Sequence, residues 1–285
     1  MKPKFSDIKD RLRFVTFTRD DLDLGRFPDF LIIGPQRTGT TWLHGNLVEH
    51  PEVFMPVEKE LYYFNSLQDP STHPTRWGEV KTDLDWYLDF FTPSADLREL
   101  LERDCQDRHG ESFRPHMLGE GTATYAAGLT AEVIDEILLL NPGVKILTMV
   151  RDPVQRAWSH AKKDLSKHAN RPIDDVAESE WVAFFDLWYQ KRCGRPSHYM
   201  PLWQARVPAE NLFVGKFRDI SQDPVALLQS VYRFLGVSDD RKYVGASAQR
   251  RINPTQDAGI PANLEAHLRQ LFEEEIALLH DLDMI

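Results

Sequence analysis

The stretch IIGPQRTGTTW (residues 32–42) decides the fold of this chain. It places Gly34 and Gly39 five residues apart, as in the phosphate-binding loop G-x-x-x-x-G-K-[ST], but Thr40 stands where that loop has lysine. The apolar run before it, DFLIIG (29–34), predicts a strand that ends at the first glycine, and the TTWLHGNLVEH run after it has the spacing of a helix. Together they predict a strand, a loop and a helix whose N-terminus faces the loop.

The missing lysine limits what such a loop can bind. In the full motif, lysine reaches the β- and γ-phosphates, and the following Ser or Thr holds a magnesium ion. Without it, the loop offers backbone N–H groups at a helix N-terminus, which suit one phosphate next to a nucleoside. A bare glycine pattern of this kind also occurs in turns that bind nothing. Here the hydroxyls of Thr38, Thr40 and Thr41 favour a ligand.

A second polar cluster, RDPVQRAWSH, follows the apolar run KILTMV (145–150). Arg151 leaves the end of this predicted strand, and Ser159 lies about two helical turns further on, so both can reach one anion. A salt bridge from Arg151 to Asp152 would explain the arginine equally well. If both anion sites are real, the ligand is a nucleotide phosphorylated on its 5′ and its 3′ side.

Strand and helix patterns alternate along the rest of the chain. Helical spacing appears at 130–141, 223–237 and in the C-terminal stretch, and a third strand is predicted at 211–217. This alternation predicts a single α/β domain with a central parallel sheet flanked by helices. The predicted organisation is an N-terminal extension (1–27) and one domain (28–285), in which residues 66–118 form a helical or loop insertion near the acceptor side.

Composition and charge exclude several classes of function. The chain has 44 acidic and 34 basic side chains, and its formal charge of -10 argues against a general nucleic-acid or anionic-membrane binder. Cys105 and Cys193 have no metal-binding or CxxC spacing, which favours a reducing compartment. Neither a secretory signal nor a run of roughly 18 apolar residues is present. We expect a cytoplasmic protein without a membrane span, although a chain trimmed of an anchor would look the same.

Six motifs together resemble the sulfotransferase family that uses 3′-phosphoadenosine 5′-phosphosulfate (PAPS). In chain order they are FLIIGPQRTGTTWL, HPEVFMPVEKELYYFN, GEGTATYA, ILTMVRDPVQRAWSH, DPVALLQSVYRFLGV and RRINPTQD. The resemblance is closer to the glycan, tyrosylprotein and bacterial types than to the cytosolic small-molecule branch. It implies a P-loop-like fold, PAPS as donor with adenosine 3′,5′-bisphosphate (PAP) as product, no metal, and a glycan or small-molecule acceptor carrying a hydroxyl or amine.

The resemblance also implies which residues hold the nucleotide. The loop around the 5′-phosphosulfate would comprise Gln36, Arg37, Thr38, Gly39, Thr40, Thr41 and Trp42, the 3′-phosphate would lie on Arg151 and Ser159, and RRINPTQD would add Arg250 and Arg251. Two adjacent arginines are more often a solvated surface pair. Arg37 stands where many members carry lysine, and because arginine stays charged it can stabilise an oxygen but cannot donate a proton.

A general base is expected in the segment PVEKELYYF, where the resemblance places Glu60 on the base of the glycan-type enzymes. If this segment is extended, Glu58 and Glu60 point to one face and Lys59 to the other. His116 is the nearest candidate for the histidine base of the small-molecule branch, although lone histidines are more often structural.

Two other readings stay open at this point. A nucleotide kinase with a degenerate loop would need magnesium and a lysine, and the sequence offers no replacement for the lysine near Thr40. A non-catalytic PAPS- or PAP-binding relic would keep the same binding residues. The segment GEGTATYA departs from the commoner family form at Ala123 and Thr124, where a proline and an acidic residue are usual, so the sequence leaves the acceptor undetermined.

Overall fold

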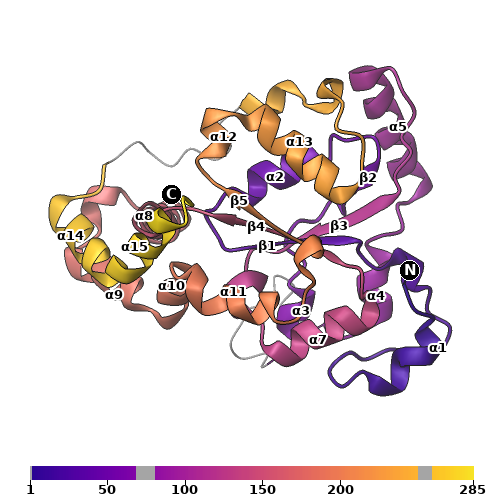
Figure 1. The fold of residues 1–285 in the computed structure, drawn as a ribbon, viewed down its shortest axis with the longest axis horizontal. Coiled ribbons are helices and arrows are strands. Elements are labelled where there is room, and N and C mark those ends of the chain that lie inside the picture. Colours follow the sequence, from indigo (N-terminus) through magenta and orange to yellow (C-terminus); the bar gives the residue numbers. More distant parts are fainter. Residues whose placement is uncertain (1, 69–80, 250–258) are drawn as a thin grey trace.

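The computed structural model describes residues 2–68, 81–249 and 259–285. Within these ranges, five parallel strands form a sheet in the order β2-β3-β1-β4-β5 (Figure 1). The strands are β1 (Phe30–Gly34), β2 (Val53–Phe54), β3 (Met117–Gly121), β4 (Lys145–Val150) and β5 (Leu212–Lys216). The predicted α/β architecture with a central parallel sheet is therefore confirmed.

The central strand β1 is buried over its whole length. Its side chains alternate between two cores: Leu31 and Ile33 belong to one hydrophobic cluster, and Phe30 and Ile32 to another. A strand covered on both faces has to be apolar at every position, which is why its sequence reads as a continuous run without alternation.

The sequence did not indicate β2 and β3. A strand of two residues such as β2 is too short to show a pattern, and β3 contains two glycines, which disfavour strands. The structure explains one of them: a Cβ on Gly119 would lie 2.0 Å from Cζ of Phe30, so the ring of the neighbouring strand fills the space beside the glycine. The missing side chain is thus part of the packing between β1 and β3.

Helices cover both faces of the sheet (Figure 1). The first cluster, around Leu31 and Ile33, is contributed by α1 (Phe5–Ile8), α3 (Tyr63–Ser66), α4 (Leu84–Asp89), α6 (Tyr125–Gly128), α7 (Ala131–Leu140) and α11 (Pro196–Gln204). The opposite face is covered by α2 (Thr40–Leu47) and α13 (Pro224–Leu235). Two further helices, α5 (Ala95–His109) and α12 (Asp219–Gln222), complete this part of the molecule.

A separate helical layer lies beyond the carboxyl end of β4. It consists of α8 (Pro153–Ala161), α9 (Glu178–Asp186), α10 (Trp188–Cys193), α14 (Ala262–Leu271) and α15 (Glu273–Asp281), and α8, α9 and α14 share a third cluster (Figure 1). Asp152 caps α8, since its carboxylate accepts a hydrogen bond from Gln155 N at 2.8 Å. None of the described helices combines the length and the apolar character that crossing a membrane requires.

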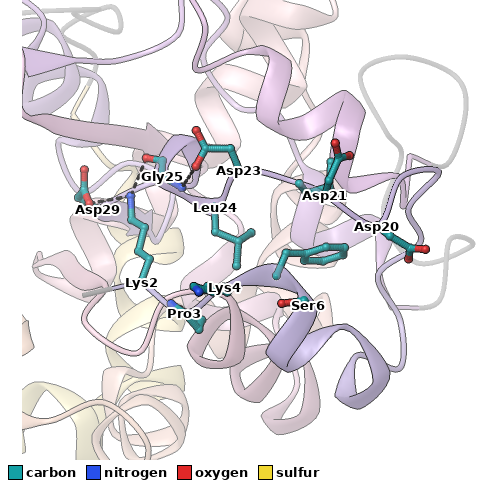
Figure 2. Close-up of a pocket in the computed structure, with 12 residues that line it drawn as sticks. Lys2, Pro3, Lys4, Ser6, Asp20, Asp21, Asp23, Leu24, Gly25 and Asp29 are labelled. Carbon is teal, nitrogen blue, oxygen red and sulfur yellow. Dashed lines mark hydrogen bonds and ion pairs between the residues drawn. The ribbon is translucent and has the colours of Figure 1, made fainter.

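The segment 1–27 is predicted as an extension, and its described residues, 2–27, pack onto the domain. Phe5, Ile8 and Phe27 are buried in the first cluster. Lys2 spans a surface hollow to reach Asp29, with 2.8 Å between its Nζ and Oδ1 (Figure 2). The predicted insertion at 66–118 contains α4, α5 and the first two residues of β3, so its upper boundary falls inside the sheet.

The packing of Phe30 against Gly119 can be tested by adding one methyl group. Gly119→Ala forces the ring out of a filled core, and we expect a loss of about 1–3 kcal/mol in the free energy of unfolding, measured by urea denaturation. The matched control is Gly143→Ala, whose Cβ would meet only Asn141 Oδ1 at 3.6 Å, and which should change stability by less than about 0.5 kcal/mol. Equal stability of both variants would contradict this account.

Candidate nucleotide and acceptor site

The glycine loop joins β1 to α2 at the carboxyl edge of the sheet. β1 lies between β3 and β4, so the loop sits where the strand order reverses, the usual ligand-binding position in such sheets. Gly34 has φ 101° and a Cβ there would lie 2.0 Å from Ala123 O, so only glycine fits. Thr38 Oγ1 donates to Pro35 O at 2.8 Å and holds the loop in its turn.

The N-terminus of α2 is built to receive an anion. Its N-cap is Gly39, with φ 96° and no side chain that could accept hydrogen bonds from the first turn. The first-turn N–H groups therefore need another partner, and the partial positive charge of the helix end favours an anionic one.

The second anion site adjoins the loop. Arg37 Nε donates to Ser159 Oγ at 2.9 Å, and an Arg151 Nη donates to Arg37 O at 2.8 Å. The guanidinium of Arg151 also lies over the Phe217 ring, 4.2 Å from its centroid. Arg37, Arg151 and Ser159 are thus brought together, although the first two are far apart in sequence. The alternative explanation for Arg151 fails, because among the described residues it forms no salt bridge with Asp152.

Positive charge accumulates here, and the charges of Asp164 and Asp152 offset it only in part. Burial, and then the charges of Arg37 and Arg156, lower the pKa of Arg151 to about 10, and burial also lowers the pKa of Arg37. Within the described ranges neither Arg37 nor Arg151 takes part in an ion pair. Partly buried cations of this kind are costly until an anion arrives, so the cluster fits a phosphate group.

Two further loop residues are fixed by distant elements. Tyr189 on α10 donates its hydroxyl to Gln36 Oε1 at 2.8 Å. Trp42 on α2 donates its indole N–H to Ala248 O at 2.9 Å. The loop is therefore connected to both the helical layer and the segment that precedes residues 250–258.

Glu60 lies at the same edge of the sheet, in a turn. Glu60 and Tyr62 have φ of 63° and 55°, and Glu60 N donates to Gly121 O at 3.1 Å. The segment is not extended here, so the condition under which Lys59 would point away from Glu60 is not met. Lys59 Nζ lies 3.2 Å from Glu60 Oε1 and 3.1 Å from Thr41 Oγ1.

The surroundings of Glu60 keep its carboxylate ionised. Burial by itself would raise its pKa, but the charge of Lys59 and the hydrogen bond from the Tyr62 hydroxyl at 2.5 Å outweigh burial, so the pKa lies below the ordinary value. An ionised carboxylate with lone pairs beside the loop is the form that a general base requires.

A buried polar group supports this turn and was not indicated by the sequence. Tyr62 N donates to Thr122 Oγ1 at 3.4 Å, and Thr122 donates in turn to Glu120. Glu120 is 1% exposed, and burial raises its pKa to about 7 despite a hydrogen bond from the Tyr87 hydroxyl at 3.1 Å. Its place in GEGTATYA, between the two glycines of β3, was the available signal.

His44 was also missed as a residue near the site. Burial, and then the charge of Lys59, lower its pKa to about 4, so it is neutral at physiological pH. It follows Thr41 by three positions on α2, which places the two on the same helix face. That spacing could have drawn attention to it.

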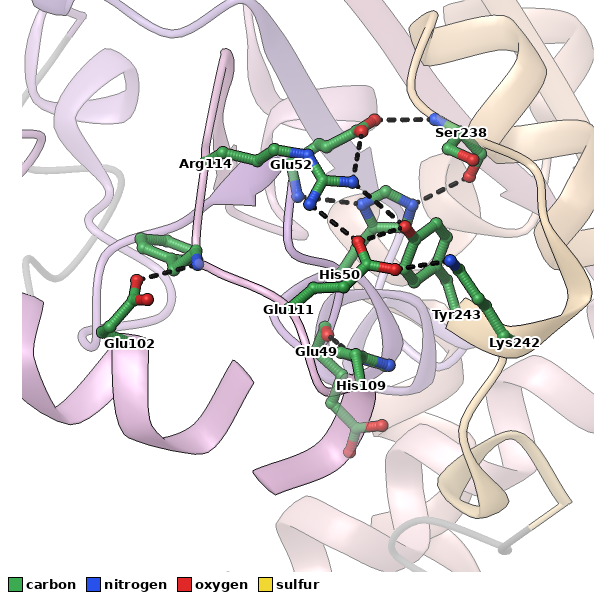
Figure 3. A network of polar contacts seen from close by, with 11 residues as sticks. Glu49, His50, Glu52, Glu102, His109, Glu111, Arg114, Ser238, Lys242 and Tyr243 are labelled. Carbon is green, nitrogen blue, oxygen red and sulfur yellow. Dashed lines mark hydrogen bonds and ion pairs between the residues drawn. The ribbon is translucent and has the colours of Figure 1, made fainter. Parts of the chain in front are cut away.

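His116 lies elsewhere. It precedes β3, at the amino end of the strand, where it is exposed and its N–H donates to Glu52 O at 3.0 Å. Its neighbour Arg114 belongs to a polar network with Glu52, Glu111 and Tyr243 (Figure 3). The five residues of β3 separate this end from Gly121 and Glu60 by about 16 Å. The structure therefore does not bring His116 to the glycine loop or to Glu60.

Arg250 and Arg251, which the resemblance adds to the nucleotide site, lie outside the described residues. Within the described ranges, no group of three His, Cys, Asp or Glu side chains is arranged to hold a metal ion.

Relatives of this chain are sulfotransferases. The chain is 28% identical over 235 residues to human "Bifunctional heparan sulfate N-deacetylase/N-sulfotransferase 2" (76% of this chain, 23% of the relative). It is 28% identical over 229 residues to the Drosophila melanogaster "Bifunctional heparan sulfate N-deacetylase/N-sulfotransferase" (74% and 20%). The chain therefore spans only about a fifth of the length of these curated relatives.

Solved structures show the same fold. The sulfotransferase from Alicyclobacillus acidocaldarius superimposes with a TM-score of 0.63 at 22% identity, covering 90% of this chain and 95% of that one. The sequence model of the sulfotransferase family matches residues 28–241, which is most of the chain. This chain belongs to the sulfotransferase family.

Proposed function

We propose that this chain is a PAPS-dependent sulfotransferase that sulfates a hydroxyl or amine of a glycan or small-molecule acceptor. One observation carries the proposal: the lysine-free loop has unpaired cationic groups, Arg37 and Arg151, at one side and an ionised carboxylate, Glu60, at the other. Family membership supports the reaction class.

The residues present fit the donor nucleotide. The N-terminus of α2 and the hydroxyls of Thr40 and Thr41 would hold the 5′-phosphosulfate, and Arg151 with Ser159 would hold the 3′-phosphate. Bound there, PAPS would supply the sulfuryl group. A terminal γ-phosphate has no lysine at position 40 to receive it, which favours this nucleotide over ATP.

Glu60 would act on the acceptor. As the acceptor oxygen or nitrogen forms its bond to sulfur, the bond from sulfur to the 5′-phosphate oxygen breaks and that oxygen keeps the electron pair. The acceptor proton passes to a carboxylate oxygen of Glu60. Holding both partners in line lowers the barrier further. Two relatives are heparan sulfate N-deacetylase/N-sulfotransferases, which supports a glycan with a reactive amine as one acceptor.

The 3′-phosphate site can be tested by comparing PAP with AMP. Arg151→Gln keeps a donor for Arg37 O but removes the charge, and we expect it to lose roughly 1.5–3 kcal/mol of PAP affinity with little change for AMP, measured by calorimetry. Arg103→Gln, on the exposed surface of α5, is the control and should keep the preference for PAP. Equal wild-type affinity for both nucleotides would show that the second anion site is misassigned.

The base can be tested by a nearly isosteric change. Glu60→Gln removes the proton acceptor, so turnover in a radiolabelled transfer assay should fall by roughly 10²–10⁴ while PAP affinity stays nearly unchanged. Glu58→Gln, the adjacent carboxylate on the same segment, should remain active. EDTA should not stop the wild-type reaction, whereas a kinase would stop. Near-normal turnover of Glu60→Gln would refute its role.

The pKa of Glu60 also predicts a pH profile. Because Lys59 and Tyr62 hold the pKa of Glu60 below its ordinary value of 4.5, the active ionised form is present above that pH and is lost as pH falls through the lowered pKa. The acidic limb of kcat/KM should therefore lie below pH 4.5. A limb near neutrality would indicate a different base.

A further inference from the structure

The sulfuryl end of the site lacks the cation that the loop itself would be expected to supply. Thr40 replaces the lysine of the full motif, and the Arg37 side chain is turned toward Ser159, with 2.9 Å between Nε and Oγ. The backbone of Arg37 is held as well, because an Arg151 Nη donates to its carbonyl oxygen at 2.8 Å. In this structure Arg37 and Arg151 therefore both lie on the side where the 3′-phosphate would bind.

Lys59 lies on the other side, between the loop and the base. Its ammonium is 3.1 Å from the hydroxyl of Thr41, in the first turn of α2, and 3.2 Å from the carboxylate of Glu60. Its side chain is 20% exposed and that of Glu60 is 27% exposed, so the pair is partly shielded from water while remaining reachable by a ligand. A cation here adds to the positive end of the α2 helix.

We infer that Lys59 is the residue that binds the sulfuryl group of the donor and stabilises charge on the oxygen that leaves, in place of a loop lysine. This inference rests on the proposed function. The contact to Thr41 places the ammonium beside the first turn of α2, where the phosphosulfate would lie, and the contact to Glu60 places it beside the acceptor. An ammonium on a flexible four-carbon stem can turn from the carboxylate to an arriving anion without moving the backbone.

The same residue resolves an electrostatic conflict. An ionised Glu60 next to an anionic phosphosulfate would repel it, and a cation between the two makes both charges favourable at once. Lys59 also contributes to the lowered pKa of Glu60, so its removal should raise that pKa. If Lys59 had only a structural role, its substitution would not change both the affinity for PAPS and the pKa of Glu60.

Calorimetry with PAPS and with PAP separates these roles, because only PAPS carries the sulfuryl group. For Lys59→Met we expect a roughly 10- to 100-fold loss of PAPS affinity and less than about twofold change for PAP. Lys59→Arg should restore part of the PAPS affinity. Lys163→Met removes a positive charge that also acts on Glu60 without contacting Thr41, and it should preserve the ratio of PAPS to PAP affinity.

The outcomes are distinguishable from failure of the proposed function. If the wild type binds neither nucleotide, both proposals fall. If the wild type binds both and transfers the sulfuryl group, but Lys59→Met keeps the same PAPS to PAP ratio or weakens both equally, only the role of Lys59 is refuted. Lys59→Gln, which can still donate to Thr41, guards against a folding defect and should show the same selective loss. In active variants lacking the Lys59 charge, the acidic limb of kcat/KM should move to higher pH.

Discussion

Two guanidinium groups that have no carboxylate partner among the described residues are the constraint around which this site is built. Arg37 and Arg151 repel each other and are partly buried, which lowers the pKa of Arg151 to about 10. The fold keeps them together through a carbonyl contact, a stacking contact on Phe217 and the hydroxyl of Ser159. Perturbed charges of this kind mark functional sites more often than structural ones. Their mutual repulsion makes the site favourable for an anion.

Arg37 and Arg151 both lie on the side of the site near Ser159. The side near Glu60 therefore needs a separate cation. The two sides differ because β1 ends between β3 and β4. The glycine loop that follows β1 therefore borders α8 on one side and the turn at Glu60 on the other. Arg37 contacts α8, and Lys59 contacts Thr41 on the loop helix. In a P-loop that has its lysine, one cation in the loop reaches the phosphates. Here the cationic groups come from separate segments of the chain.

The sequence predicted those elements whose pattern is local. The apolar runs of β1, β4 and β5 depend on neighbouring residues only, and the sequence predicts all three strands. β3 was not, because Gly119 is explained by the Phe30 ring of another strand. The contact of Arg37 with Ser159 joins residues 122 positions apart. His116 is close to GEGTATYA in sequence, but in the structure the length of β3 separates it from Glu60.

The position of Lys59 beside Glu60 depends on a turn whose backbone is strained. Glu60 and Tyr62 adopt left-handed backbone that only glycine adopts easily, and such residues persist where their surroundings hold them and function requires them. The holding groups are Gly121 O, Thr122 and the buried Glu120 behind it. A segment with ordinary extended backbone would turn Lys59 away from Glu60 and leave the carboxylate without its cation. The strained turn therefore brings Glu60 and Lys59 to the same face of the loop, and the glycine-rich end of β3 supplies the backbone acceptor that makes this turn possible.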